Sequence, residues 1–296
     1  MRVLHSLLCV GLLAGCSPWS SEPPAHPTLT RVAGVPFYPQ EGFRCGPAAM
    51  AMVLDWSGLF VKPAALEAHF FSLKDPRKTL AETANRYGRL AYPIAGTNAM
   101  LTELAAGHPV VVVQNLGVDS APVWNCAVAV GFDKAQNQIL VHAGDQAAKR
   151  MSVRLFERLW ADTDNWGLVV LRPGELPAAA RQPDYVKAAY NLERSGRYWE
   201  AVLAYDAGLA LWPNDPDTLM GLGSSLYLLG DPRGAAEAYR AASVVAPDPS
   251  PASAALAQIA TELAQRSETV AAADKPLPPP LARPTRTGQR LKETTR

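Results

Sequence analysis

Cys45 is the residue of this chain whose type and surroundings most clearly predict chemistry. An apolar stretch beginning at Gly46 follows it through Trp56, and Gln40 lies five residues upstream. The stretch predicts a helix that starts at the cysteine, and the N–H groups and dipole of a helix N-terminus lower the pKa of a thiol there. A glutamine amide at this spacing is placed to donate a hydrogen bond to the oxyanion of acyl transfer. Cys45 is therefore the candidate nucleophile and Gln40 the candidate oxyanion donor.

Two segments, Gln40–Asp55 and Val123–Asp133, resemble the papain-like bacteriocin-processing peptidases, which trim double-glycine leaders. The resemblance implies a papain-like α+β domain over residues 31–176, with a cysteine nucleophile and an upstream glutamine in the oxyanion hole. It also implies a histidine base at the start of the Val-rich strand, oriented by an acidic residue on the next strand. This chain has Asn125 at the position of that histidine.

Asn125 leaves the expected site without its base, because an asparagine neither takes up nor returns a proton near neutral pH. One alternative moves the base to His142, at the end of the next strand, with Asn125 as the orienting amide and Asp145 as a further orienting candidate. A second is a degenerate site that binds without cleaving. A third takes the base from His69 or His108, the other histidines of this domain. The sequence leaves all three open.

Cys126 raises the question of a disulfide with Cys45. Side chains alternate between the two faces of a strand, so Cys126 points away from Cys45 if Asn125 faces it. We therefore expect no bridge between the two, and we expect Cys126 to be a buried small apolar residue.

The elements that position these residues form an α+β pattern, in which one helix carries the cysteine and an antiparallel sheet follows. Ser152 is a predicted helix N-cap, and Gly107 is a predicted helix terminator. The predicted helices cover residues 46–56, 63–69, 98–106 and 152–161, and the predicted strands cover 109–114, 125–132, 138–142 and 166–171.

A second domain is predicted over residues 177–266 from a repeat with a period of 34 residues. The repeat pairs Gly196 with Gly230, Ala201 with Ala235, Tyr205 with Tyr239 and Pro213 with Pro247. This period and these residue types resemble the tetratricopeptide repeat. The resemblance implies an all-α domain of two helix pairs, closed by a capping helix over 251–265, that recruits a protein partner.

The N-terminal residues predict a targeting signal, and the C-terminal residues predict a disordered tail. Residues 1–15 have a basic residue, a short apolar core and small residues, which is typical of a secretory signal. The ending before Cys16 resembles a bacterial lipobox, which implies lipidation of Cys16, a tether over 16–30 and a place on the outer membrane facing the periplasm. Residues 267–296 are Pro-rich and basic and predict a disordered tail.

Composition narrows the function further. The 296 residues carry a net charge of +1, which gives no case for a nucleic-acid partner. No Cys/His spacing suggests zinc, and no Gly-rich or acidic loop suggests nucleotide or calcium, so no cofactor is predicted. We expect an envelope lipoprotein whose cysteine-peptidase-like domain hydrolyses a peptide or protein segment. The alternatives are a non-catalytic pseudo-peptidase that binds peptides, and an acyltransferase or thioester hydrolase.

Overall fold

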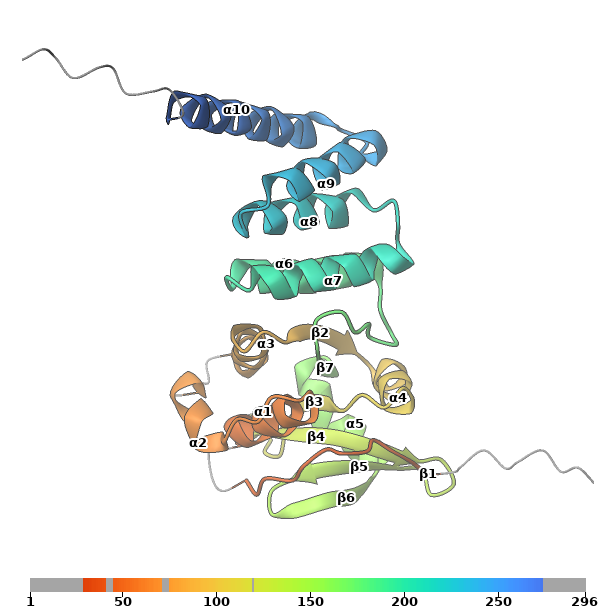
Figure 1. The fold of residues 1–296 in the computed structure, drawn as a ribbon. Helices are drawn as coiled ribbons and strands as arrows, with labels where there is room; N and C mark the ends of the chain where they lie inside the picture. Colours follow the sequence, from red (N-terminus) through yellow and green to blue (C-terminus); the bar gives the residue numbers. More distant parts are fainter. Residues whose placement is uncertain (1–28, 41–44, 71–74, 119, 274–296) are drawn as a thin grey trace, which may run out of the picture. The chain divides into compact units, whose positions relative to one another are not determined.

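The computed structural model describes residues 29–40, 45–70, 75–118 and 120–273 (Figure 1). The chain divides into one unit of residues 1–80 and 93–170, and another of 81–92 and 171–296. The first mixes helices with a sheet, and the second is mostly helical, which confirms the expected classes at this level. The predicted boundary at residue 176 lies near residue 171, where the second unit resumes. Within that unit, the Tyr92 hydroxyl accepts a hydrogen bond from the Arg181 N–H at 3.0 Å.

The sheet of the first unit has seven strands. Six follow the order β2-β7-β3-β4-β5-β6, and β1 pairs with the far end of β4. Strand β3 is buried along its whole length and lies between β4 and β7, antiparallel to both. The strands are β1 (Leu29–Arg31), β2 (Leu90–Ala95), β3 (Val110–Asn115), β4 (Trp124–Asp133), β5 (Gln138–Ala143), β6 (Gln146–Ser152) and β7 (Trp166–Leu171).

Helix α1 (Cys45–Trp56) packs against β4 (Figure 1). Every residue from Cys45 to Leu54 is buried, so the helix has no polar face for solvent. A helix that is apolar all round is stable only when neighbouring elements cover it completely. This requirement places its first residue, Cys45, inside the unit and beside the sheet.

Helix α5 (Val153–Trp160) begins where the sequence predicts, because the Ser152 Oγ accepts a hydrogen bond from the Leu155 N–H at 3.3 Å. Its apolar side buries Phe156 and Trp160. The remaining helices of the N-terminal half are α2 (Pro63–Leu66), α3 (Pro76–Arg86), α4 (Thr97–Ala105) and the 3-10 turns η2 (Glu67–Phe70) and η3 (Ala161–Thr163).

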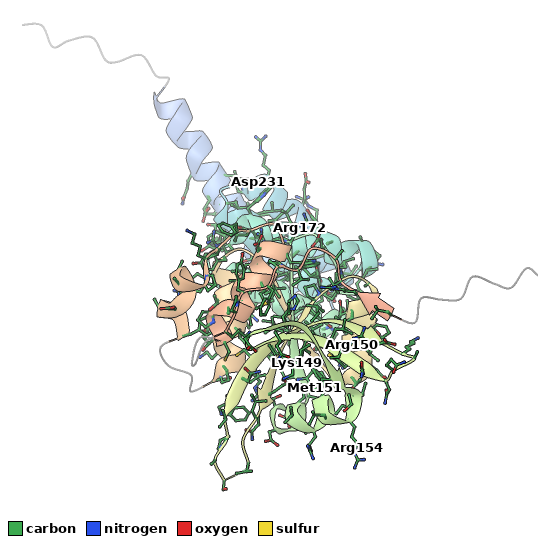
Figure 2. All side chains as sticks on the ribbon, turned by 90° about the horizontal axis from the view of Figure 1, so that it is seen from below. Lys149, Arg150, Met151, Arg154, Arg172 and Asp231 are labelled. Atoms are coloured by element: carbon green, nitrogen blue, oxygen red, sulfur yellow. The ribbon has the colours of Figure 1, made fainter. Side chains whose placement is uncertain are left out.

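Strand β6 is absent from the predicted elements. Figure 2 shows Lys149, Arg150 and Met151 along it, with Arg154 on the following helix. Only Met151 is buried in this strand, so its sequence lacks the apolar alternation that predicts a strand. Its charged side chains suit an edge strand, because they oppose pairing with another chain.

The second unit continues with five helices, and each helix contacts the one that follows it in the chain. These are α6 (Gln182–Arg194), α7 (Tyr198–Leu211), α8 (Pro216–Leu228), α9 (Pro232–Val245) and α10 (Ser250–Ala273). The predicted helix pairs are present at these positions. Helix α10 continues past residue 266, where the sequence predicted a disordered tail.

Glycines let the helices of this unit approach bulky side chains. A Cβ on Gly223 of α8 would lie 2.6 Å from the Tyr239 ring of α9, and one on Gly221 would lie 2.2 Å from Tyr205 of α7. The carboxylate of Glu193 joins the same helices, because it accepts hydrogen bonds from the hydroxyls of Tyr205 and Ser224 at 3.2 and 2.6 Å. Small residues on α8 therefore set the spacing of this layer.

Several predictions fall outside the described residues: the signal peptide, the lipidated Cys16, most of the tether and residues 274–296. Among the described helices, none combines the length and apolar character needed to cross a bilayer.

We expect Gly223→Ala to destabilise the helical unit by about 1–3 kcal/mol, since the new methyl group overlaps the Tyr239 ring. Helix propensity alone predicts the opposite sign, a gain of about 1 kcal/mol. Urea unfolding followed by circular dichroism measures the effect, and adding Tyr239→Leu should recover part of the loss. A stabilised Gly223→Ala variant would contradict the close packing.

Candidate active site

Cys45 occupies the N-terminus of α1 and its side chain is buried, with a relative exposure of 6%. Gly46 gives room for the ring of Phe70, because a Cβ there would lie 2.6 Å from the ring. The pKa of the Cys45 thiol is lowered to about 7, chiefly by a hydrogen bond from the Cys126 side chain. Burial opposes this shift, and the backbone N–H groups of Cys126, Gly46 and Cys45 add to it. A substantial fraction of the thiol is therefore ionised at neutral pH.

Cys126, on β4, is the neighbour that sets this ionisation. Its own pKa is raised well above the ordinary value, by the side chain of Cys45 first and then by burial, so it stays a protonated donor. The expectation that Cys126 points away from Cys45 is wrong. The two cysteines are free thiols, as was predicted, although the orientation argument behind that prediction fails.

Asn125 lies on the other face of β4, because successive side chains of a strand alternate. Its cross-strand partner is Gln114 of β3. The register pairs His142 with Val128, three residues from Asn125 and before the irregularity that follows Ala129. An odd separation puts His142 and Asn125 on opposite faces. The predicted exchange, with His142 as base and Asn125 as its orienting amide, is therefore wrong.

His142 shares the sheet face of Cys126, but its ring is already engaged. Its Nδ1 accepts a hydrogen bond from the Ala148 N–H at 2.9 Å, and its ring lies 5.4 Å from that of Phe37. Burial lowers the pKa of His142, and a hydrogen bond with the Val35 backbone partly opposes that shift. A backbone group that raises a histidine pKa accepts a hydrogen bond from the ring, so Val35 engages the ring in addition to Ala148. This neutral ring has no free nitrogen with which to act as a base.

Gln40 is fixed by two hydrogen bonds to Gly144, in the turn between β5 and β6. Its backbone N–H donates to the Gly144 carbonyl at 2.8 Å, and its Oε1 accepts the Gly144 N–H at 3.0 Å. The Nε2 atom is buried and has no hydrogen-bond partner among the described residues. A buried donor left unpaired is costly and is typical of a functional position.

The other histidines and the further acidic candidate lie in different surroundings. His108 Nδ1 pairs with the buried carboxylate of Glu103 at 2.7 Å and packs edge-on to Trp56. His69 lies in η2, and Asp145 is exposed in the β5–β6 turn. None of the three is among the groups that shift the pKa of Cys45.

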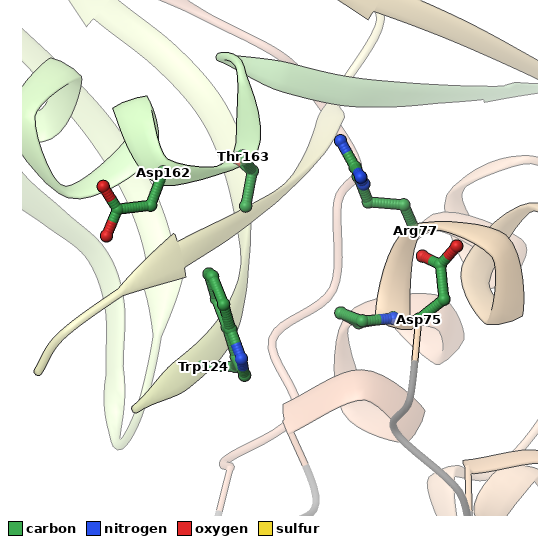
Figure 3. Close-up of a pocket in the computed structure, with 6 residues that line it drawn as sticks. Asp75, Arg77, Trp124, Asp162 and Thr163 are labelled. Atoms are coloured by element: carbon green, nitrogen blue, oxygen red, sulfur yellow. The ribbon is translucent and has the colours of Figure 1, made fainter. Parts of the chain in front are cut away.

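A surface pocket of about 300 Å³ opens at the start of β4. Figure 3 shows Trp124, Asp162 and Thr163 along one side and Asp75 and Arg77 along the other. No signal in the sequence brought Trp124, Asp75 and Asp162 together. No group of side chains in the described part of the chain is arranged to hold a metal ion.

Residues 32–165 match the model of the Peptidase_C39 like family. The matched region is a little under half of the chain and includes Cys45 and Cys126. A solved C39-like peptidase from Bacillus anthracis is 16% identical, with a TM-score of 0.42 over 48% of this chain and 97% of that one. The peptidase domain of Streptococcus ComA, a bifunctional ABC transporter of a quorum-sensing pathway, is 19% identical, with a TM-score of 0.37 over 47% and 98%. A comparison with curated proteins finds no match.

Within the region that matches this family, Cys126 is the site residue that the sequence analysis missed. Its position directly after Asn125 was visible, but nothing in the sequence settled which of the two faces α1. The roles of Cys45 and Gln40 stay predictions, now with a geometry that suits them.

Replacing Cys126 tests its effect on Cys45. We expect Cys126→Val to raise the apparent pKa of Cys45 above about 7, because valine offers no hydrogen-bond donor to the thiolate. Cys126→Ser keeps a donor and should retain most of the lowering. The rate of Cys45 alkylation by iodoacetamide across pH, mapped by peptide mass, gives both values. Identical profiles for valine and serine would contradict a donor role.

The buried neutral His142 should make stability fall in acid. Its pKa is lowered in the folded protein, so the unfolded chain binds more protons once the pH drops below the unfolded value of about 6.5. His142→Asn keeps an acceptor for the Ala148 N–H but does not titrate there. We expect the urea midpoint of the wild type to fall more steeply than that of the variant between neutral pH and pH 5. Parallel curves would show that His142 contributes nothing to the acid sensitivity.

Proposed function

We propose that Cys45 is the nucleophile of a cysteine-peptidase-like hydrolase that acts on a peptide or protein segment. The observation that carries the proposal is a buried thiol at a helix N-terminus whose pKa is lowered to about 7. A thiolate at that position is the reactive form of a cysteine nucleophile. The match to the Peptidase_C39 like family over residues 32–165 supports the same class.

The nucleophilic attack and the oxyanion that it forms each have a candidate group. The Cys45 thiolate attacks a carbonyl carbon, and the unpaired Nε2–H of Gln40 donates a hydrogen bond to the oxyanion that forms. Collapse of this intermediate expels the leaving group and leaves a thioester on Cys45, which water then hydrolyses. A leaving amine must be protonated, and His142 has no free nitrogen for that step. We therefore expect esters and thioesters to react faster than amides.

A non-catalytic peptide-binding module is the second candidate. It is favoured by Asn125, which takes the place of the family's base and lies on the far face of β4, and by the engaged ring of His142. In that case the pocket beside Trp124 would hold an extended chain without cleavage.

The sequence also supports a proposal for the location of the protein and for the role of its C-terminal helices. We propose that Cys16 carries the lipid of an outer-membrane lipoprotein facing the periplasm, because residues 1–16 have the pattern of a lipoprotein signal. Residues 177–266 would act as tetratricopeptide repeats that recruit a protein partner. The 34-residue period and the helix pairs from α6 to α9 support this assignment.

An activated ester separates the two functions without knowledge of the natural substrate. We expect p-nitrophenyl acetate to acetylate Cys45 with release of nitrophenolate, and Cys45→Ala to abolish this burst. Peptide mapping by mass spectrometry places the acetyl group and distinguishes Cys45 from Cys126. Cys45 that is alkylated by iodoacetamide but never acetylated would instead support the binding module.

A further inference from the structure

Residues 32–40, here called the strap, cross the sheet face that carries Cys126 and His142. One end is held by the Val32 N–H, which donates to the Val130 carbonyl of β4 at 2.8 Å. The other end is held by the two hydrogen bonds between Gln40 and Gly144. The position of the Gln40 amide therefore depends on how the strap lies between these two ends.

The strap is also tied to the helix that carries the nucleophile. The Tyr38 hydroxyl donates to the Asp55 Oδ2 of α1 at 2.7 Å, and burial and this carboxylate raise the pKa of Tyr38 to about 12. Tyr38 therefore stays a donor at any physiological pH. This contact joins the strap to the C-terminal end of α1. It does not hold the middle residues of the strap.

His142 contacts the middle residues of the strap. Its ring packs at a tilt against Phe37, with the two ring centroids 5.4 Å apart, and it hydrogen-bonds with the Val35 backbone. Its Nδ1 is held by Ala148, whose positive φ of 48° turns its N–H toward the ring. A cavity of about 320 Å³ lies beside these contacts, lined by residues 31–35 together with Val130 and His142. Since that space is open, the strap could shift there without the contacts of His142.

We propose that His142 is a positioning residue that holds the strap so that the Gln40 Nε2–H points at the oxyanion site. This inference rests on the proposed function, because it assigns the histidine to the same acyl chemistry. In this role His142 transfers no proton. Its ring connects β6 to the strap, and Gln40 lies at the end of the strap. His142 does not touch the reacting atoms.

Two reactions of Cys45 distinguish positioning from general damage. Acetylation by p-nitrophenyl acetate passes through an oxyanion, whereas alkylation by iodoacetamide does not. We expect Gln40→Ala to slow acetylation about 100-fold, as for the loss of one oxyanion donor, and His142→Phe to slow it about tenfold. Alkylation should stay within about twofold in both. Phe37→Leu, which leaves the sheet intact, should give a smaller loss of the same kind, and Lys149→Ala on exposed β6 should change neither rate.

The decisive measurement combines the variants. If His142 acts through Gln40, adding His142→Phe or Phe37→Leu to Gln40→Ala should not slow acetylation further. Multiplying effects, or equal losses of acetylation and alkylation, would overturn the positioning role while leaving the nucleophile in place. A wild type that is alkylated but not acetylated would overturn the proposed function and the positioning role with it.

Discussion

The burial of α1 from Cys45 to Leu54 is the constraint on which the site depends. A helix without a polar face has to be covered on every side, and β4 supplies much of that cover. The helix starts at Cys45, so the same packing that stabilises the unit also carries a thiol away from water. Burial alone would raise the pKa of that thiol and leave it unreactive. The fold therefore requires hydrogen-bond donors at this helix end if Cys45 is to ionise.

Those donors come from the backbone and from a second thiol. The N–H groups of Gly46 and Cys45 belong to the first turn of α1, whose N–H groups have no acceptor within the helix. Cys126 adds its side chain from the sheet. Papain-like sites obtain the same ionisation from an imidazole, which can also return the proton. A thiol whose pKa is raised can donate a hydrogen bond but is a poor proton shuttle. The site therefore stabilises a thiolate better than it completes amide cleavage.

The sequence predicted the elements with strong local signals, missed β1, α3, β2 and β6, and misjudged the orientation of β4. Helix α1, strand β7 and the Ser152 cap have strong local signals, and they lie where they were expected. Strand β4 is buried on both faces from Cys126 onward, so no alternation of polar and apolar residues marks the side that meets α1. A one-residue error in that choice exchanges Asn125 and Cys126. Strand β6 was missed because only one of its side chains is buried.

His142 shows why a residue type at a suggestive position does not define a role. A histidine at the end of a strand near a candidate nucleophile resembles a base until its partners are known. Ala148 supplies one of those partners, and its backbone has a positive φ, a conformation that alanine rarely adopts and that no sequence pattern predicts. Once Nδ1 accepts that N–H, the other ring nitrogen carries the proton of the neutral imidazole. The ring also hydrogen-bonds with the Val35 backbone of the strap. The imidazole therefore acts as a hydrogen-bonding group held in place rather than as an acid or base. Its effect on Cys45 must then pass through the backbone that leads to Gln40.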